Sequence, residues 1–205
     1  YFLAELNSEA IGLRGFSPHE TKCWLYYPED NCPFYRCTVF SHYAKANCPA
    51  DDCQLSTIRR GDKSITDASD GTKKEGPYWS LMFEVSESQK YKPVDMTTIV
   101  EETIQGAINT GMIQGSDEIV SIYHRRLEHG YPTPSLERDS VLEEALPMLK
   151  KKDIWSRGRF GSYKYEVANQ DHSCMIGVEC VDNILYGSKE FTLLYPSLTN
   201  EGGKK

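Results

Sequence analysis

Aromatic, strand-like segments in the first half of the chain constrain its fold most. Residues 34–43 alternate between two sets of side chains, residues 22–27 are short and aromatic, and a Pro-Glu-Asp-Asn turn separates the two segments. This pattern is typical of a β-hairpin. A further strand is predicted at Tyr78–Val85, and we expect it to pair with the hairpin. No strand leads into the glycine-rich turn of a dinucleotide-binding unit, since residues 11–15 carry only two glycines.

Apolar residues with helical spacing predict three helical regions. The clearest begins after Asp95, the predicted N-cap, and stops at Gly111. A second region covers residues 136–149 and contains Pro147, which we expect to kink or divide it, and a third covers residues 172–185. Further strands are predicted at residues 118–127, 154–160, 164–167 and 191–195. The sequence therefore predicts an α+β fold, a mainly antiparallel sheet with packed helices.

The length and composition predict one globular domain. A chain of 205 residues with 39% hydrophobic residues can bury a core, and we predict a single α+β domain over residues 1–205. Residues 54–76 are rich in Ser, Thr, Asp, Gly and Lys, and have almost nothing to bury. We expect them to form a flexible insertion between neighbouring strands.

Charge and hydropathy exclude several kinds of partner. The 23 Lys and Arg residues against 30 Asp and Glu residues give a net charge of -7, which argues against binding to nucleic acid or to an anionic membrane. No apolar stretch approaches the ~18 residues of a spanning helix, and the first residues lack signal-peptide features. We predict a soluble, cytoplasmic protein. Because the sequence begins at Tyr1, we expect either processing or a piece of a longer polypeptide.

Cysteine usage favours a reducing compartment. Seven cysteines cannot all pair with one another, and five of them lie between Cys23 and Cys53. Their spacings are looser than those of a structural zinc site, so we predict free thiols and no metal site.

The run from Ile154 to Leu185 combines a basic turn, two tyrosines, an Asn-Gln-Asp-His sequence and a helix start. A helix N-terminus favours anions or polarised carbonyl oxygens, and here it follows Arg157 and Arg159. The alternative interpretation is a polar strand, turn and capped helix without a ligand. Arg36, among aromatic residues of the predicted hairpin, also has two interpretations. Its guanidinium either reaches solvent at a sheet edge or holds an anion in a cleft.

Three motifs in order resemble UDP-galactopyranose mutases and related mutase-like flavoproteins. The motifs are Pro33–Arg36, Gly130–Pro134 and the segment from Gly158 to His172, with its GRF, YKY and NQDH sequences. The resemblance extends from about Cys23 to Leu185. It implies the substrate domain and C-terminal portion of a family member, without the N-terminal Rossmann half that binds FAD.

The resemblance also implies roles for particular residues. The implied substrate-binding residues, which would contact a diphosphate or a base, are Arg36, Tyr131, Tyr163 and Tyr165. The implied cofactor-binding residues, near the flavin, are Arg159, Asn169, Gln170, Asp171 and His172. We expect Arg36, Arg159 and the helix start to converge on one anion-binding pocket. No catalytic residue is assigned.

One helix end and one arginine cannot hold a cofactor as large as FAD. We therefore expect FAD only with a Rossmann-containing partner, and no mutase activity from this chain alone. Partners implied are that polypeptide or a second copy of this chain, and a nucleotide sugar or glycan.

The sequence offers two alternatives to the flavoprotein interpretation. The chain could be a non-catalytic carbohydrate- or nucleotide-binding module, in which aromatic rings stack on a sugar or base. By their burial tendency, however, most of the aromatic candidates are expected to lie in the core. The aromatic candidates for stacking are Trp24, Tyr26, Tyr35, Trp79 and Trp155. A hydrolytic set of Asp171, His172 and Ser173 is disfavoured because the side chains of adjacent residues diverge.

Overall fold

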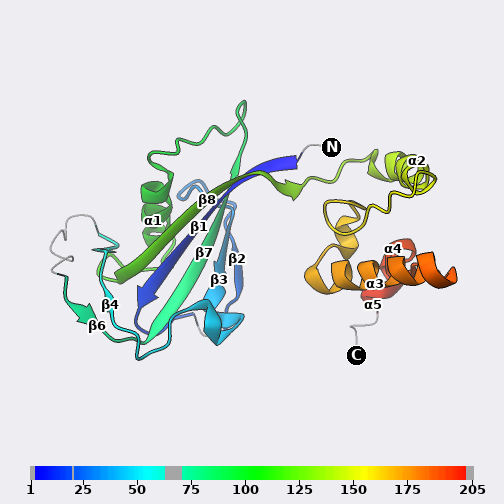
Figure 1. Ribbon diagram of the computed structural model, residues 1–205. Helices are drawn as coiled ribbons and strands as arrows, with labels where there is room; N and C mark the ends of the chain where they lie inside the picture. The colour runs from blue at the N-terminus through cyan, green and yellow to red at the C-terminus, as the bar shows by residue number, and fades with distance from the viewer. Residues whose placement is uncertain (1–2, 20, 63–70, 202–205) are drawn as a thin grey trace. The chain divides into compact units, whose positions relative to one another are not determined.

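The computed structural model describes residues 3–19, 21–62 and 71–201 (Figure 1). The chain forms two compact units, Ala4–Gly130 and Tyr131–Lys205, the latter together with Tyr1–Leu3. We call them the sheet unit and the helical unit. The expected single domain over residues 1–205 stays a prediction.

The sheet unit is built on a six-stranded sheet with the strand order β2-β3-β7-β1-β8-β5. The predicted hairpin is confirmed, because β2 and β3 pair antiparallel, and β3 pairs with β7 as expected. The strands of this sheet are β1 (Leu3–Arg14), β2 (Trp24–Tyr26), β3 (Arg36–Val39), β5 (Arg59–Arg60), β7 (Tyr78–Glu87) and β8 (Glu118–Pro132). Together with the helices, this mainly antiparallel sheet confirms the α+β class.

Helix α1 (Ile99–Asn109) packs on one face of the sheet (Figure 1). Its buried Ile104 and Ala107 share a core with β1, β3 and β7 side chains. The helix ends at Asn109, and Gly111, the predicted stop, follows shortly after it with a left-handed φ of 71°. The predicted N-cap is wrong, because Thr98 occupies that position and the Asp95 carboxylate instead accepts a 2.8 Å hydrogen bond from the Thr97 N–H.

Strand β1 was not predicted, and its buried residues explain why. Ile11 and Leu13 point into the core, but so do Asn7 and Glu9, which are 0% and 1% exposed. Two polar residues on the buried face remove the apolar alternation that identifies a half-buried strand. Glu9 lies opposite Phe83 of β7 in the antiparallel register.

The expected insertion at residues 54–76 has strands at both ends. Strands β4 (Leu55–Ser56) and β6 (Lys73–Lys74) pair with each other, and β5 pairs with β8. Arg14 joins these segments to the sheet, donating 2.7 Å hydrogen bonds to the carbonyls of Leu55, Lys74 and Glu75. Residues 63–70 of the insertion lie outside the described residues.

The helical unit contains short helices around a small core of Val167, Ile176 and Leu193. Its helices are α2 (Arg138–Lys150), α3 (Gln170–Tyr186), α4 (Phe191–Leu194), α5 (Pro196–Glu201) and the 3₁₀ turn η4 (Tyr165–Val167). Pro147 lies inside α2 without dividing it. Helix α3 confirms the predicted third helix and ends at Gly187 with a left-handed φ of 70°.

Three strands predicted for the helical unit are wrong. Residues 154–160 form a loop, residues 164–167 contain η4, and residues 191–195 contain α4. Positive φ angles turn the chain at Gly158, within the first of these regions, and at Tyr163, just before the second, so extended strands cannot continue through these positions.

Two other findings concern membrane-spanning helices and the cysteines. Among the described residues, no helix combines the length and apolar character needed to cross a membrane. All seven cysteines are free thiols, and Cys37 and Cys180 are buried.

Candidate functional site

The loop between α2 and α3 presents Arg159 from a tight turn. The Gly158 carbonyl accepts hydrogen bonds from the Ser162 N–H at 2.9 Å and from the Ser162 hydroxyl at 3.0 Å. A Cβ atom at Gly161 would lie 2.2 Å from the carbonyl oxygen of Arg157, so only glycine fits there. The glycines of the GRFGSY sequence therefore fix the backbone on which Arg159 stands.

Neutral groups hold the Arg159 side chain. Its Nε donates a 2.8 Å hydrogen bond to the carbonyl of Ala168, and its Nη2 lies 3.4 Å from Oδ1 of Asn169. The guanidinium carbon lies 5.1 Å from the centroid of the Tyr131 ring. Within the described part of the chain, no carboxylate lies within ion-pair distance of Arg159. Its positive charge therefore remains available to an anion or a polarised oxygen.

Four of the residues expected to bind ligands come together here. The Tyr131 ring contacts both Arg159 and the ring of Tyr165, whose centroid lies 6.0 Å away at an interplanar angle of 65°. Asn169 is the fourth, through its contact with Arg159. The structure thus groups Tyr131 and Tyr165, expected on the substrate, with Arg159 and Asn169, expected on the cofactor.

The N-terminus of α3 lies directly beside this group. Asn169 is the N-cap residue, but its side chain does not cap the helix. Gln170 and Asp171 are exposed, and Nδ1 of His172 is buried without a hydrogen-bond partner in the described residues. A buried polar nitrogen that makes no hydrogen bond destabilises the folded protein by about 1–3 kcal/mol. A ligand or further protein that formed a hydrogen bond with this nitrogen would therefore gain binding free energy.

Tyr163 adopts an uncommon backbone conformation. Its φ of 52° lies in the left-handed region, which costs a non-glycine residue about 1–2 kcal/mol. The hydrogen bonds around Gly158 and Ser162 therefore outweigh the local preference of Tyr163.

Arg36 belongs to the sheet unit, where it forms an ion pair with Glu84. Its Nε and Nη2 donate to the two oxygens of Glu84 at 2.9 and 2.6 Å, and the Tyr35 hydroxyl donates to Glu84 at 2.5 Å. Burial alone would lower the pKa of Arg36, but hydrogen bonds with Tyr26 and Glu84 raise it above its ordinary value. The guanidinium also lies within 5.9 Å of the ring centroids of Trp24, Tyr26 and Tyr35.

Sequence reasoning missed Glu84, although a signal was present. Glu84 is the one charged residue in the mainly apolar and aromatic strand segment Tyr78–Val85, and it is only 5% exposed. A buried carboxylate requires a partner, so its presence in a strand next to Arg36 indicates an ion pair. Arg36 neither extends freely into solvent nor carries an uncompensated charge.

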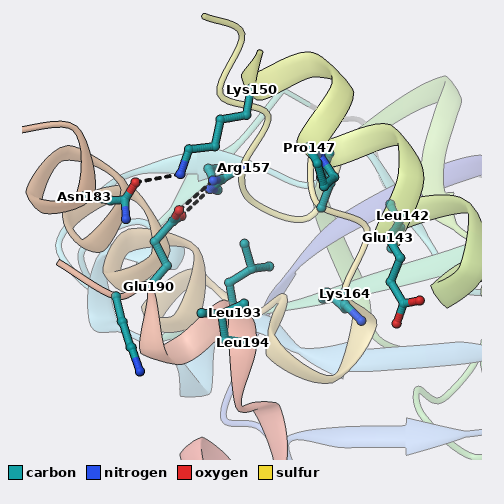
Figure 2. A pocket seen from close by; sticks show the side chains of 12 residues that line it. Leu142, Glu143, Pro147, Lys150, Arg157, Lys164, Asn183, Glu190, Leu193 and Leu194 are labelled. Atoms are coloured by element: carbon teal, nitrogen blue, oxygen red, sulfur yellow. Dashed lines mark hydrogen bonds and ion pairs between the residues drawn. The ribbon is translucent and has the colours of Figure 1, made fainter. Parts of the chain in front are cut away.

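A cavity of about 500 Å³ in the helical unit contains none of the expected site residues (Figure 2). Leu142 of α2 and Leu193 of α4 contribute apolar surface, and Lys150 donates a 2.9 Å hydrogen bond to Asn183. At its wall, Arg157 Nη2 donates to Glu190 at 2.7 Å, and Arg157 Nε donates to the other oxygen. This ion pair joins the Arg159 loop to the segment before α4.

Comparison with known proteins agrees with this architecture. No protein-family model matches the chain. The fold is that of a partial mutase-like domain. In particular, the chain is similar to a UDP-galactopyranose mutase, solved as a crystal structure of the reduced enzyme, with a TM-score of 0.78 and 43% sequence identity. The match covers 98% of this chain and 37% of that protein, so the resemblance to part of a mutase is confirmed.

Proposed function

We propose that this chain provides the substrate-binding and flavin-facing part of a mutase-like flavoprotein. The observation that carries the proposal is that Arg159 lies against the Tyr131 ring beside the start of α3 and pairs with no carboxylate of the described residues. The chain spans about a third of the length of the mutase that it resembles. The remaining structure, including the dinucleotide-binding fold, is then supplied by another polypeptide or by further residues of a longer chain.

The residues at the start of α3 fit one end of a flavin. Arg159 and the helix N-terminus favour negative charge on the flavin pyrimidine, and Asn169 and Gln170 offer amide groups. His172 has a ring nitrogen available, and Asp171 is exposed nearby. Bound flavin supplies the redox-active ring system of the reaction. No described strand leads into a glycine-rich turn and helix, so these residues hold FAD only together with a partner.

The proposed substrate is a nucleotide sugar. A guanidinium matches the oxygens of a diphosphate, and Arg36 of the sheet unit supplies one. Tyrosine hydroxyls add neutral donors, which Tyr131, Tyr163 and Tyr165 of the helical unit supply. Glu84 keeps Arg36 charged and fixed. We assign no catalytic residue to this chain and expect no mutase reaction without the partner.

Exposed apolar residues on α3 support a partner polypeptide. Met175, Val178, Val181 and Leu185 lie on the helix at spacings of three and four residues, and all are exposed. A regular apolar stripe of this kind is typical of a helix that packs against another element. A second copy of this chain is the alternative occupant. We also propose a cytoplasmic location, because free thiols are typical of a reducing compartment.

Flavin and mass measurements on one native sample test the proposal. We expect flavin absorption in the purified sample and a co-purifying polypeptide, or a longer form of the chain, by intact mass. Adding FAD to the flavin-depleted sample should raise its unfolding temperature. Replacing Arg159 with Met should reduce that rise, whereas Arg125→Met, at an exposed arginine of β8, should not. The absence of flavin, together with no thermal shift, would contradict the proposal.

A second function is favoured by two exposed rings beside Arg36. Trp24 and Tyr26 are 55% and 60% exposed, and could stack on a sugar or base in a non-catalytic binding module. Calorimetric titration with UDP and UDP-sugars separates the two functions. Binding without any response to FAD would favour the module.

A further inference from the structure

Tyr131 has two chemically distinct parts that face different tasks. Its hydroxyl is a donor suited to a phosphate oxygen, which is the role that the proposed function gives it. Its ring lies under the Arg159 guanidinium at 5.1 Å and contacts the tilted ring of Tyr165 at 6.0 Å. The ring is therefore already engaged within the helical unit.

The ring restrains the part of Arg159 that other contacts hold least. The hydrogen bond to Ala168 fixes Nε, at the root of the guanidinium, at 2.8 Å. At the tip, the 3.4 Å contact from Nη2 to Asn169 is at the limit of hydrogen bonding. Two other arginines of the helical unit are held by ion pairs with carboxylates instead. Arg138 pairs with Glu166 at 2.8 Å, and Arg157 pairs with Glu190. Among the residues that the structure describes, Arg159 has no such carboxylate partner, so the aromatic face supplies its remaining restraint.

We propose that Tyr131 is a positioning residue for Arg159, acting through its ring and independently of its hydroxyl. An aromatic face attracts a cation without neutralising it, so it orients the guanidinium and leaves the charge available. A carboxylate in the same place would orient Arg159 equally well but would cancel the charge that an anion requires. The identity of the ligand rests on the proposed function, whereas the restraint on Arg159 does not.

Substitutions at Tyr131 separate the ring from the hydroxyl. Tyr131→Phe keeps the ring, and Tyr131→Leu removes both parts. The direct measurement is NMR of the arginine Nε–H groups of the 205-residue chain, with the Arg159 signal assigned from its loss in Arg159→Lys. Tyr186→Leu, at an exposed tyrosine at the end of α3, is the matched control.

We expect Tyr131→Phe and Tyr186→Leu to leave the Arg159 Nε–H signal and its solvent exchange unchanged. Tyr131→Leu should move the signal and speed its exchange about fivefold, as expected for the loss of one cation–π contact. Equal behaviour of the Phe and Leu variants would overturn the proposal. Unfolding temperatures identify a Leu variant that has lost its fold, and Tyr131→Met, of similar bulk but without an aromatic face, then replaces it.

Titration with FAD in the complete complex distinguishes this inference from the proposed function. Tyr131→Leu should weaken FAD binding about fivefold and Tyr131→Phe should not. If Arg159→Met leaves FAD affinity unchanged, the proposed function is wrong, and the NMR comparison alone still decides whether the ring positions Arg159. If Arg159→Met weakens binding while the Phe and Leu variants bind FAD equally, the positioning role is wrong.

Discussion

Replacing Glu9 with Gln should stabilise the sheet unit at alkaline pH and have little effect under acidic conditions. Glu9 is 1% exposed on β1, and both of its carboxylate oxygens lack a hydrogen bond in the described residues. The His124 Nε2 atom of β8 lies 3.4 Å from one of these oxygens, but also 3.3 Å from Asn7. Burial raises the pKa of Glu9 from 4.5 to about 7.

The sign of the effect follows from this raised pKa. The folded protein binds the Glu9 proton more tightly than the unfolded chain does, so stability is full below about pH 4.5 and falls as the pH rises to about 7. Ionisation in the folded state then costs about 3 kcal/mol, since each pKa unit corresponds to about 1.4 kcal/mol. Gln has nearly the same shape as protonated Glu and cannot ionise, so it avoids this cost.

Urea unfolding of both proteins between pH 5 and pH 8.5 measures the effect. The stability advantage of Glu9→Gln should grow with pH and approach about 3 kcal/mol at the alkaline end. Glu29→Gln, at an exposed position of the same unit, should show no such growth. An advantage that stays constant across this range would refute the argument that a buried, neutral carboxyl group is present.

Three further predictions concern both units. Gly161→Ala should lower the unfolding temperature, because the added Cβ would lie 2.2 Å from a backbone oxygen and destabilise the fold by about 1–3 kcal/mol. Gly177→Ala is the control: its Cβ would point into open space on α3, and the change should raise the free energy of unfolding by about 0.5–1 kcal/mol. Arg157→Met should destabilise the chain by about 3–5 kcal/mol in urea unfolding, because it leaves buried Glu190 unpaired, and adding Glu190→Gln should recover part of that loss. Arg36→Lys should weaken UDP binding about tenfold by calorimetry, since an ammonium group cannot reproduce the fork that pairs with both oxygens of Glu84 and still offer further fixed N–H groups to an anion; unchanged affinity would remove Arg36 from the site.

The sequence predicts the elements that have clear periodicity and misses those in which polar residues are buried. The hairpin, strand β7 and helices α1 and α3 show regular apolar spacing, and all are found. Strand β1 is hidden because Asn7 and Glu9 occupy its buried face. The loop after α2 resembles two strands in sequence, but its shape is fixed by Gly158 and Gly161, where single backbone angles and one close contact decide the path.

The residue types of the candidate site could be predicted from the sequence, but the state of their charges could not. Arg36 and Arg159 look alike as cations near aromatic residues. The partner of Arg36, Glu84, lies 48 positions further along the chain and meets it only because β3 pairs with β7. Arg159 meets an aromatic ring and neutral oxygens instead.

This difference assigns distinct electrostatic roles to the two arginines. An anion that contacts Arg36 must share the guanidinium with a buried carboxylate, which opposes the anion while holding the guanidinium in place. An anion that contacts Arg159 meets the full charge, reinforced by the partial positive charge of the α3 N-terminus. Arg36 is therefore suited to recognising the shape of a diphosphate, and Arg159 to stabilising charge on a bound group. Raising the salt concentration should accordingly weaken a ligand held by Arg159 more than one held by Arg36.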